Sequence, residues 1–240
     1  MKSQKQLVVV APTGVAAINA KGVTIHSFFQ LPFGPILPDK EFKSSSNFNR
    51  KFSKAKIDII KSLDLLVIDE ISMVRADMLD GIDKTLRRYK NKNLVFGGVQ
   101  LLMIGDLQQL SPVVKESEWQ LLKGFYKNAF FFSSQAYQHS NVLTIELKHI
   151  YRQENAIFIN ILNEIRNNNL SITSAIELNK RYIKDFEPSS EEGYISLTTH
   201  NNKAREANRY ELEKLEGKEH VYKEIVEGNS LNIHNQIKRN

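Results

Sequence analysis

Two acidic residues that directly follow a short apolar run are the strongest chemical signal in this sequence. Residues 65–68 read Leu-Leu-Val-Ile, which has the length of a buried parallel strand, and Asp69 and Glu70 come next. Open α/β sheets bind ligands at the carboxyl ends of their strands, so a site is expected here. In nucleoside triphosphate hydrolysis, an aspartate at such a place holds Mg²⁺, and a neighbouring glutamate can activate water. Alternatively, both acids only stabilise the start of the following helix.

A second apolar run with polar residues at its end supports the first interpretation. Residues 100–104 read Gln-Leu-Leu-Met-Ile and are followed by Gly105 and Asp106, with Gln109 shortly after. Two such runs predict neighbouring parallel strands that deliver polar side chains to one cleft. In that cleft, Gln109 would sense or position the γ-phosphate of a nucleotide.

The surrounding pattern predicts the elements that hold these two strands. Further strands are expected at residues 7–11, 130–132, 142–145 and 195–202. Helices are expected from residue 15, after residue 73, at residues 135–138 and 157–165, and after residue 202. The helix after Met73 is amphipathic, with apolar residues toward the sheet and charged residues on its other faces.

The basic residues are concentrated at the start of the chain. The formal net charge is +6, and residues 1–60 alone hold nine Lys and Arg against three Asp and Glu. This asymmetry favours a polyanionic partner, although a solvated basic loop would produce it as well. By composition, residues 31–56 form a surface loop. Its phenylalanines either stack on bases or pin the loop to the core, and they are Phe33, Phe42, Phe48 and Phe52.

The composition bounds the class of protein. With 240 residues, 41% of them hydrophobic and 25% charged, the chain has room for one large domain or for one domain and part of another. It has no apolar run near the roughly 20 residues that a membrane helix needs, so no membrane partner is expected. Cysteine is absent, which excludes disulfides and thiol metal sites and fits a reducing cytoplasm.

Three sequence strings, in this order and with these gaps, carry a resemblance to a known family. They are residues 69–73 (Asp-Glu-Ile-Ser-Met), 96–101 (Phe-Gly-Gly-Val-Gln-Leu) and 105–113 (Gly-Asp-Leu-Gln-Gln-Leu-Ser-Pro-Val). The chain resembles the DNA helicases named for petite integration frequency, which belong to the 5′-to-3′ branch of superfamily 1 and are related to RecD.

This resemblance implies a fold, cofactors and a partner. The fold class is α/β: a RecA-like P-loop NTPase parallel sheet flanked by helices at residues 1–146, and part of a second RecA-like domain at residues 147–240. The implied cofactors are ATP and Mg²⁺, and the implied partner is single-stranded DNA. The implied location is cytoplasmic, at the nucleoid if the source is bacterial.

The resemblance also assigns catalytic roles. It implies that Asp69 binds Mg²⁺, that Glu70 is the general base, and that Gln109 contacts the nucleotide beside Asp69. It further implies that Arg152 reaches across an interdomain cleft to the γ-phosphate, where such an arginine is worth roughly 10³ to 10⁵ in turnover in other enzymes. Judged without the family, Arg152 is a solvated basic residue before a helix.

A second group of residues is implied in DNA binding. In the first domain the group comprises Thr13, Gly14, Thr24 and His26, and in the second domain Thr199 and Asn201. Without the family, a histidine beside aromatic residues, as His26 is, reads as an ordinary core residue.

One element that such a motor needs is missing from the sequence. The phosphate loop, G-x-x-x-x-G-K-[ST], wraps the β-phosphate in backbone amides. None of the 11 glycines fits it, since the only Gly-Lys pair, Gly217 and Lys218, is followed by Glu219. We therefore expect a window of a longer helicase that is inactive alone. Two other functions stay open: a non-catalytic nucleic-acid-binding remnant of a truncated helicase gene, and an ATPase without DNA activity.

Overall fold

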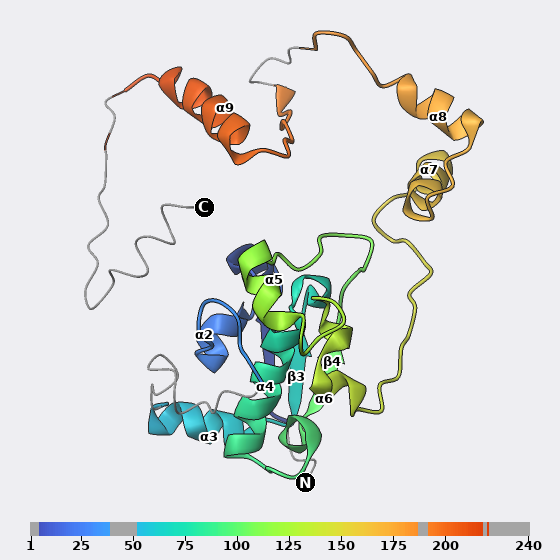
Figure 1. The fold of residues 1–240 in the computed structure, drawn as a ribbon. Coiled ribbons are helices and arrows are strands. Elements are labelled where there is room, and N and C mark those ends of the chain that lie inside the picture. The colour runs from blue at the N-terminus through green and yellow to red at the C-terminus, as the bar shows by residue number, and fades with distance from the viewer. Residues whose placement is uncertain (1–4, 39–51, 187–191, 218–219, 221–240) are drawn as a thin grey trace. The chain divides into compact units, whose positions relative to one another are not determined.

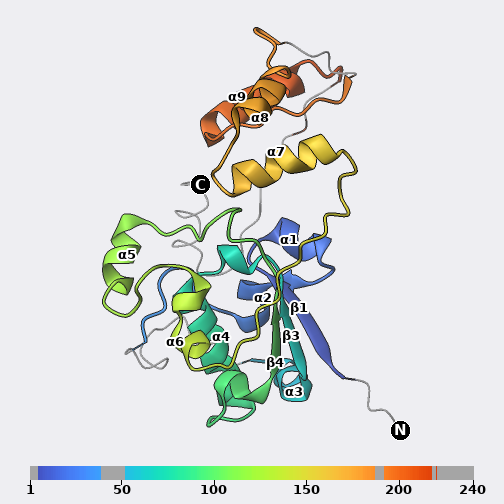
Figure 2. The same ribbon diagram turned by 90° about the vertical axis from the view of Figure 1, so that its right-hand side faces the viewer.

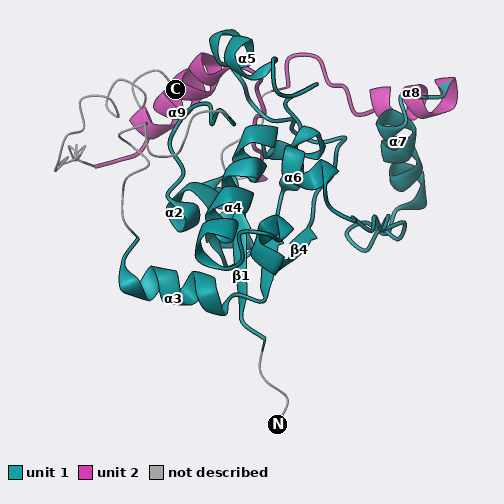
Figure 3. Ribbon diagram, turned by 60° about the horizontal axis from the view of Figure 1, so that its bottom comes forward, with its two compact units in different colours: residues 1–171 teal, residues 172–240 magenta. Residues whose placement is uncertain are grey.

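The computed structural model describes residues 5–38, 52–186, 192–217 and 220 (Figure 1). The chain divides into two compact units, residues 1–171 and residues 172–240, which Figure 3 draws in different colours. Each unit is described by itself below. No helix in the described ranges is long and apolar enough to cross a membrane.

Four parallel strands form the sheet of the first unit, in the order β2-β1-β3-β4. Their bounds are β1 Leu7–Ala11, β2 Val23–Thr24, β3 Leu65–Ile68 and β4 Gln100–Met103. Val10 lies opposite both Val23 and Ile68, and Ile68 lies opposite Met103. Strands β1, β3 and β4 run side by side in Figure 2. The residues that follow these strands therefore meet at one edge, as the sequence predicts.

The core of the first unit lies between this sheet and the helices beside it. Val10 and Leu66 have no exposed surface, but the residues that alternate with Leu66 in β3 are partly exposed and Leu102 in β4 is 48% exposed. One face of the sheet is therefore less covered than the continuous apolar runs predict. Helix α4 (Ala76–Tyr89) lies along one face of the sheet in Figures 1 and 2 and buries Leu79 completely. The same core cluster includes residues of α2 Ile25–Phe29 and α3 Lys54–Ser62.

Helix α4 is amphipathic and packs on the sheet as predicted, but its other faces are not all open to solvent. Asp77, Asp80 and Asp83 on these faces are all buried. Each carboxylate accepts a backbone N–H from a different segment, and the donors are Ile36, Ala136 and Phe96, respectively. These segments cover the second face of the helix, and a repeat of apolar residues cannot reveal such a cover because the contacts are polar. Helix α4 is therefore the anchor for three segments far apart in sequence.

Two predicted strands after β4 are wrong. Residues 131–133 form a 3₁₀ turn, η3 (Phe131–Ser133), and residues 142–145 have no regular secondary structure. Phe131 packs into the core beside Tyr137, with ring centroids 5.5 Å apart, instead of pairing with a strand. The short helix predicted between them is confirmed as α6 (Gln135–Gln138). An apolar run alone does not separate a strand from a turn that inserts aromatic rings.

The predicted helices at both ends of the chain are present. They are α1 Gly14–Asn19, α7 Ala156–Arg166 in the first unit, and α9 Asn201–Glu213 in the second unit, which also holds α8 Ile172–Asn179. The strand predicted at residues 195–202 is wrong, since residues 194–198 are exposed and irregular and α9 already begins at residue 201. The spacing of Ala204, Ala207, Leu212 and Leu215 predicts an inward apolar face for this helix, but none of the residues of α9 is buried. The domain boundary after residue 146 stays a prediction.

Candidate functional site

Asp69 lies where β3 ends, between the ends of its two neighbouring strands. Its backbone N–H donates to the carbonyl oxygen of Val10 in β1, at 2.9 Å. On the other side, the N–H of Ile104 donates to the carbonyl oxygen of Ile68, also at 2.9 Å. The hydrogen bonds between the strands thus continue up to Asp69 and Ile104. The acid pair and the Gly105–Asp106 turn therefore begin side by side.

The local geometry of the acid pair does not fit helix capping. One carboxylate oxygen of Asp69 accepts the N–H of Glu70 at 3.0 Å, and its second oxygen has no hydrogen-bond partner in the part of the chain that the structure describes. Glu70 precedes the 3₁₀ turn η1 (Ile71–Met73) without a side-chain capping bond, and α4 takes Arg75 as its N-cap. Neither acid therefore caps the helix that follows.

The backbone of Glu70 has the left-handed conformation, with φ 52° and ψ 45°. For a residue other than glycine this conformation costs about 1 kcal/mol. A hydrogen bond to the residue that follows β4 holds this turn, because the N–H of Ile71 donates to the carbonyl oxygen of Ile104 at 2.9 Å. A Cβ on Gly105 would stand 2.9 Å from the side chain of Ile71 and 3.0 Å from its backbone nitrogen. Close packing of the two strand ends thus fixes the direction of Glu70.

Asp106 organises the loop that carries Gln109. Its carboxylate accepts the N–H of Gln108 at 3.0 Å, the side-chain Nε2 of Gln109 at 3.2 Å, and Nη2 of Arg166 at 2.8 Å. The bond from Gln108 lowers the pKa of Asp106 most, and the bonds from Arg166 and Gln109 lower it further. Asp106 is therefore an anion that positions the predicted phosphate sensor. The predicted site included Gln109 but neither Asp106 nor Arg166.

Two of the predicted DNA-contacting residues start helices at the same edge. The hydroxyl of Thr13 accepts the N–H of Ala16, and the hydroxyl of Thr24 accepts the N–H of Ser27, each at 3.2 Å. Both threonines are thus N-caps, which is a structural role independent of DNA. A Cβ on Gly14 would meet nothing within 4 Å, so packing does not require glycine there.

His26 is half-buried, and another aromatic ring covers one face of its imidazole. The ring of Phe33 stacks on it with centroids 5.2 Å apart and planes inclined by 12°, and 67% of Phe33 is exposed. Burial lowers the pKa of His26, the charge of Arg75 lowers it further, and Asp77 opposes them. The pair is therefore an uncharged, partly exposed aromatic surface at neutral pH.

Arg75 holds the loop that carries Phe33. Its guanidinium donates to the carbonyl oxygen of Gly34 at 2.9 Å and forms ion pairs with Asp77 at 2.8 Å and Glu118 at 3.3 Å. Burial acts to lower the pKa of Arg75, but the hydrogen bond and charge of Asp77 outweigh it and raise the pKa. Phe33 is thus presented by an ordered loop.

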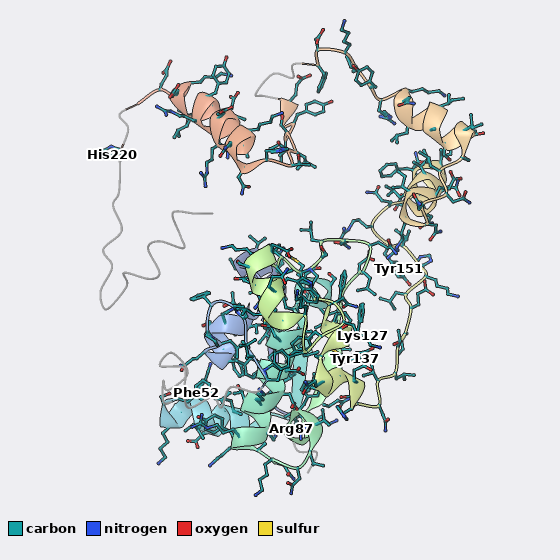
Figure 4. All side chains as sticks on the ribbon, in the orientation of Figure 1. Phe52, Arg87, Lys127, Tyr137, Tyr151 and His220 are labelled. Atoms are coloured by element: carbon teal, nitrogen blue, oxygen red, sulfur yellow. The ribbon has the colours of Figure 1, made fainter. Side chains whose placement is uncertain are left out.

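The other phenylalanines of the predicted basic loop divide into two groups. Phe52, labelled in Figure 4, packs against Tyr89 with ring centroids 5.2 Å apart and touches the core, so it pins the chain. Lys56, a basic residue of the same predicted loop, belongs instead to α3, and its ammonium group lies 4.0 Å from the ring of Phe28. Phe42 and Phe48 lie outside the described residues.

The remaining predicted site residues are not brought to this edge by any described contact. Arg152 is exposed in an irregular segment at residues 141–155, next to Tyr151, which Figure 4 labels. Thr199 is exposed and its hydroxyl lies 2.8 Å from Nδ1 of His200, while Asn201 is the first residue of α9. The functional roles of these three residues stay predictions.

Asp69 at this edge has the chemistry of a magnesium ligand. No group of three or more His, Cys, Asp or Glu capable of holding a metal occurs within the described ranges. Magnesium usually takes only one or two carboxylates and completes its shell with water and phosphate oxygens, so Asp69 with one unbonded oxygen is a suitable donor. The 240 residues contain no loop that would wrap the phosphates.

A parallel α/β sheet with an acid pair and a glutamine loop at the carboxyl ends of adjacent strands is the arrangement of a RecA-like domain. The chain belongs to the PIF1-like helicase family, whose model matches residues 1–175.

Known proteins similar to this chain are longer than it is. It is 32% identical over 228 residues to the ATP-dependent DNA helicase PIF1 of Saccharomyces cerevisiae strain YJM789, covering 94% of this chain and 25% of that protein. It is 33% identical over 218 residues to the helicase Pif1 of Campylobacter jejuni, covering 90% of this chain and 46% of that protein. The crystal structure of Pif1 helicase from Bacteroides in complex with ADP-AlF3 and ssDNA matches with a TM-score of 0.81 and 41% identity, covering 90% of this chain and 49% of that one.

Proposed function

We propose that this chain is part of an ATP-dependent DNA helicase motor that moves along single-stranded DNA, in the 5′-to-3′ direction implied by its resemblance. The observation that carries the proposal is the arrival of Asp69 and the Gln109 loop at one edge of a RecA-like sheet, from the adjacent strands β3 and β4. Its relatives are named ATP-dependent DNA helicases, and one solved relative was crystallised with ADP-AlF3 and single-stranded DNA. A cytoplasmic location is part of the proposal.

ATP and Mg²⁺ are the proposed cofactors. Asp69 would hold the metal through the carboxylate oxygen that the N–H of Glu70 does not use. When bound, Mg²⁺ neutralises charge on the β- and γ-phosphates. Glu70, which stands beside Asp69 on a backbone fixed by close packing, would accept the proton of the attacking water.

Gln109 and Arg152 are the proposed partners of the γ-phosphate. The Gln109 amide donates to Asp106 in the structure and would exchange this bond for a phosphate oxygen. Arg152 would add positive charge from an exposed segment once the motor closes. Both roles depend on a phosphate loop that these residues do not supply.

Single-stranded DNA is the proposed partner of the surface around β1 and β2. Thr13, Gly14, Thr24 and His26 follow or end these strands and would contact the DNA. Phe33 adds an exposed ring that an ordered loop presents, as in proteins that stack bases on aromatic side chains. Thr199 and Asn201 of the second unit are also proposed to contact single-stranded DNA.

The alternative proposal is a non-catalytic protein that keeps the DNA-binding surface without the motor. The absence of a phosphate loop from the 240 residues favours it for this chain in isolation. The two proposals share the DNA-binding surface, so they differ only in nucleotide turnover and not in DNA binding.

DNA binding by the purified chain tests what both proposals share. We expect a fluorescent single-stranded oligonucleotide to bind with an affinity that falls steeply as salt rises, because phosphate contacts release counterions. The matched control is a duplex of the same sequence, which should bind more weakly. Absence of binding even at low salt would overturn both proposals.

A further inference from the structure

Asp106 accepts side chains from two separate parts of the first unit on the same oxygen. Oδ2 takes the amide Nε2 of Gln109 at 3.2 Å and Nη2 of Arg166 at 2.8 Å. Gln109 is three residues away in the same loop, whereas Arg166 is the last residue of α7. The predicted phosphate sensor and α7 are thus joined through one carboxylate.

This ion pair is too exposed to be mainly a stabilising contact. The side chain of Arg166 is 47% exposed and that of Asp106 is 25% exposed. Partly exposed pairs of this kind contribute little to the free energy of folding. A charged bond of 2.8 Å still fixes direction, because the guanidinium holds the carboxylate that Gln109 also uses.

We propose that Arg166 is a positioning residue that links α7 to Gln109 through Asp106. The inference rests on the proposed function, in which Gln109 contacts the γ-phosphate. When Gln109 leaves Asp106 for a phosphate oxygen, Arg166 still neutralises the carboxylate, so the exchange leaves no unpaired charge. The end of α7 therefore stays at the sheet edge both when Gln109 contacts Asp106 and when Gln109 contacts the phosphate.

The position of α7 matters because Arg152 lies just ahead of it. The helix begins at Ala156, and a rise of about 1.5 Å per residue puts its first and last residues about 15 Å apart along the axis. Holding Arg166 at the sheet edge restricts where the start of the helix can go. The same ion pair therefore limits the positions that Arg152 can reach.

Hydrogen exchange of the chain without nucleotide or DNA tests the link alone. In Arg166→Ala, we expect the backbone amides of Gln108 and Gln109 to exchange about two- to fivefold faster, the range for one partly exposed ion pair. Arg166→Lys, which keeps the charge, should restore part of the protection. The matched control is Arg209→Ala, which removes an ion pair of the same 2.8 Å length in α9 and should leave these amides unchanged.

The side-chain amide signal of Gln109 in a ¹⁵N NMR spectrum separates positioning from a general structural role. We expect it to shift in Arg166→Ala while the melting temperature stays within experimental error. The double variant of Arg166→Ala and Asp106→Asn should show the same Gln109 signal and the same exchange rates as Asp106→Asn alone, because both substitutions act on one carboxylate. An unchanged Gln109 signal and unchanged exchange in Arg166→Ala would overturn the link. Failure of the chain to bind DNA would count against the proposed function and leave these two readouts intact.

Discussion

Phe33 stacks on His26 with nearly parallel rings, although 67% of Phe33 is exposed. Exposed aromatic rings are usually mobile, but this one sits on a loop that Arg75 and Asp77 bind through the backbone of Gly34 and Ile36. The ring is therefore available to a ligand and already ordered, so binding need not supply the cost of ordering it.

Removal of the Phe33 ring should weaken DNA binding without weakening the fold. In Phe33→Ala we expect the dissociation constant for single-stranded DNA to rise about fivefold or more, since stacking is worth about 1–3 kcal/mol per base. The unfolding midpoint should stay constant. Tyr182→Ala, at a residue that is 75% exposed in the second unit, is the control and should not change binding. Equal affinities for Phe33→Ala and the parent chain would exclude stacking on this ring.

A methyl group on Gly105 should disturb the acid pair. In Gly105→Ala the new Cβ would lie within about 3 Å of Ile71 and Ser72, including their backbone nitrogens, so η1 must move. We expect a loss of about 1–3 kcal/mol in the free energy of unfolding, measured with urea. Gly124→Ala is the control, because its Cβ would meet nothing within 4 Å. Equal stability of the two variants would show that the strand ends are not packed as described.

Asp80 is expected to be a sensitive position among the buried acids of α4. It accepts the hydroxyl of Tyr126 and the backbone N–H of Ala136, both at 2.8 Å, and that of Gln135 at 3.1 Å. Asp80→Ala leaves these buried donors unpaired, which should cost about 3 kcal/mol or more. Asp58→Ala on the exposed face of α3 is the control and should change stability by less than about 0.5 kcal/mol. Chemical unfolding monitored by circular dichroism measures both.

The stability of the first unit should fall as the solution is acidified below neutral pH. Burial, with Arg75, lowers the pKa of His26 from its ordinary value of 6.5. The unfolded chain therefore takes up the proton first, so the contribution of neutral His26 is complete above pH 6.5 and is lost as pH falls toward the lowered pKa. Replacement by His26→Gln should reduce the difference between urea midpoints at about pH 7.5 and about pH 5.5. An equal difference between the two urea midpoints in His26→Gln and in the parent chain would contradict this role of His26.

The 240-residue chain should release no phosphate from ATP, even with single-stranded DNA. Asp69 and Glu70 are present, but the sequence contains no loop that would hold the phosphates against them. A coupled phosphate assay of the parent chain and of Asp69→Asn should give equal, background rates. Release that depends on DNA and disappears in Asp69→Asn would refute the prediction and favour the motor over the non-catalytic alternative.

Short-range pattern was enough to predict three strands of the sheet, β1, β3 and β4, and the edge where the candidate site residues of β3 and β4 meet. Strands β1, β3 and β4 are apolar runs that end in polar residues, and parallel strands bring such ends together. The predicted strand at residues 142–145 failed because an apolar run does not show whether a neighbouring strand is present to pair with it. The failure at residues 195–202 has the same cause.

Contacts between polar residues that lie far apart in the sequence could not be predicted from it. Arg166 and Asp106 are sixty positions apart, and no periodicity connects them. The burial of Asp80 depends on Tyr126 and α6, which only the folded chain brings beside α4. Charged residues on a helix are ordinarily predicted as solvated, and this rule fails where loops return to bond with them.

The three aspartates of α4 also have a mechanical meaning. Asp77 grips the loop behind Phe33, while Asp83 grips the backbone N–H of Phe96, just before β4 and the Gln109 loop. In the proposed motor, α4 would therefore connect the proposed DNA-binding surface directly to the proposed hydrolysis site, without a change in the sheet. The stiffness of this single helix would limit how much force the two sites can exchange.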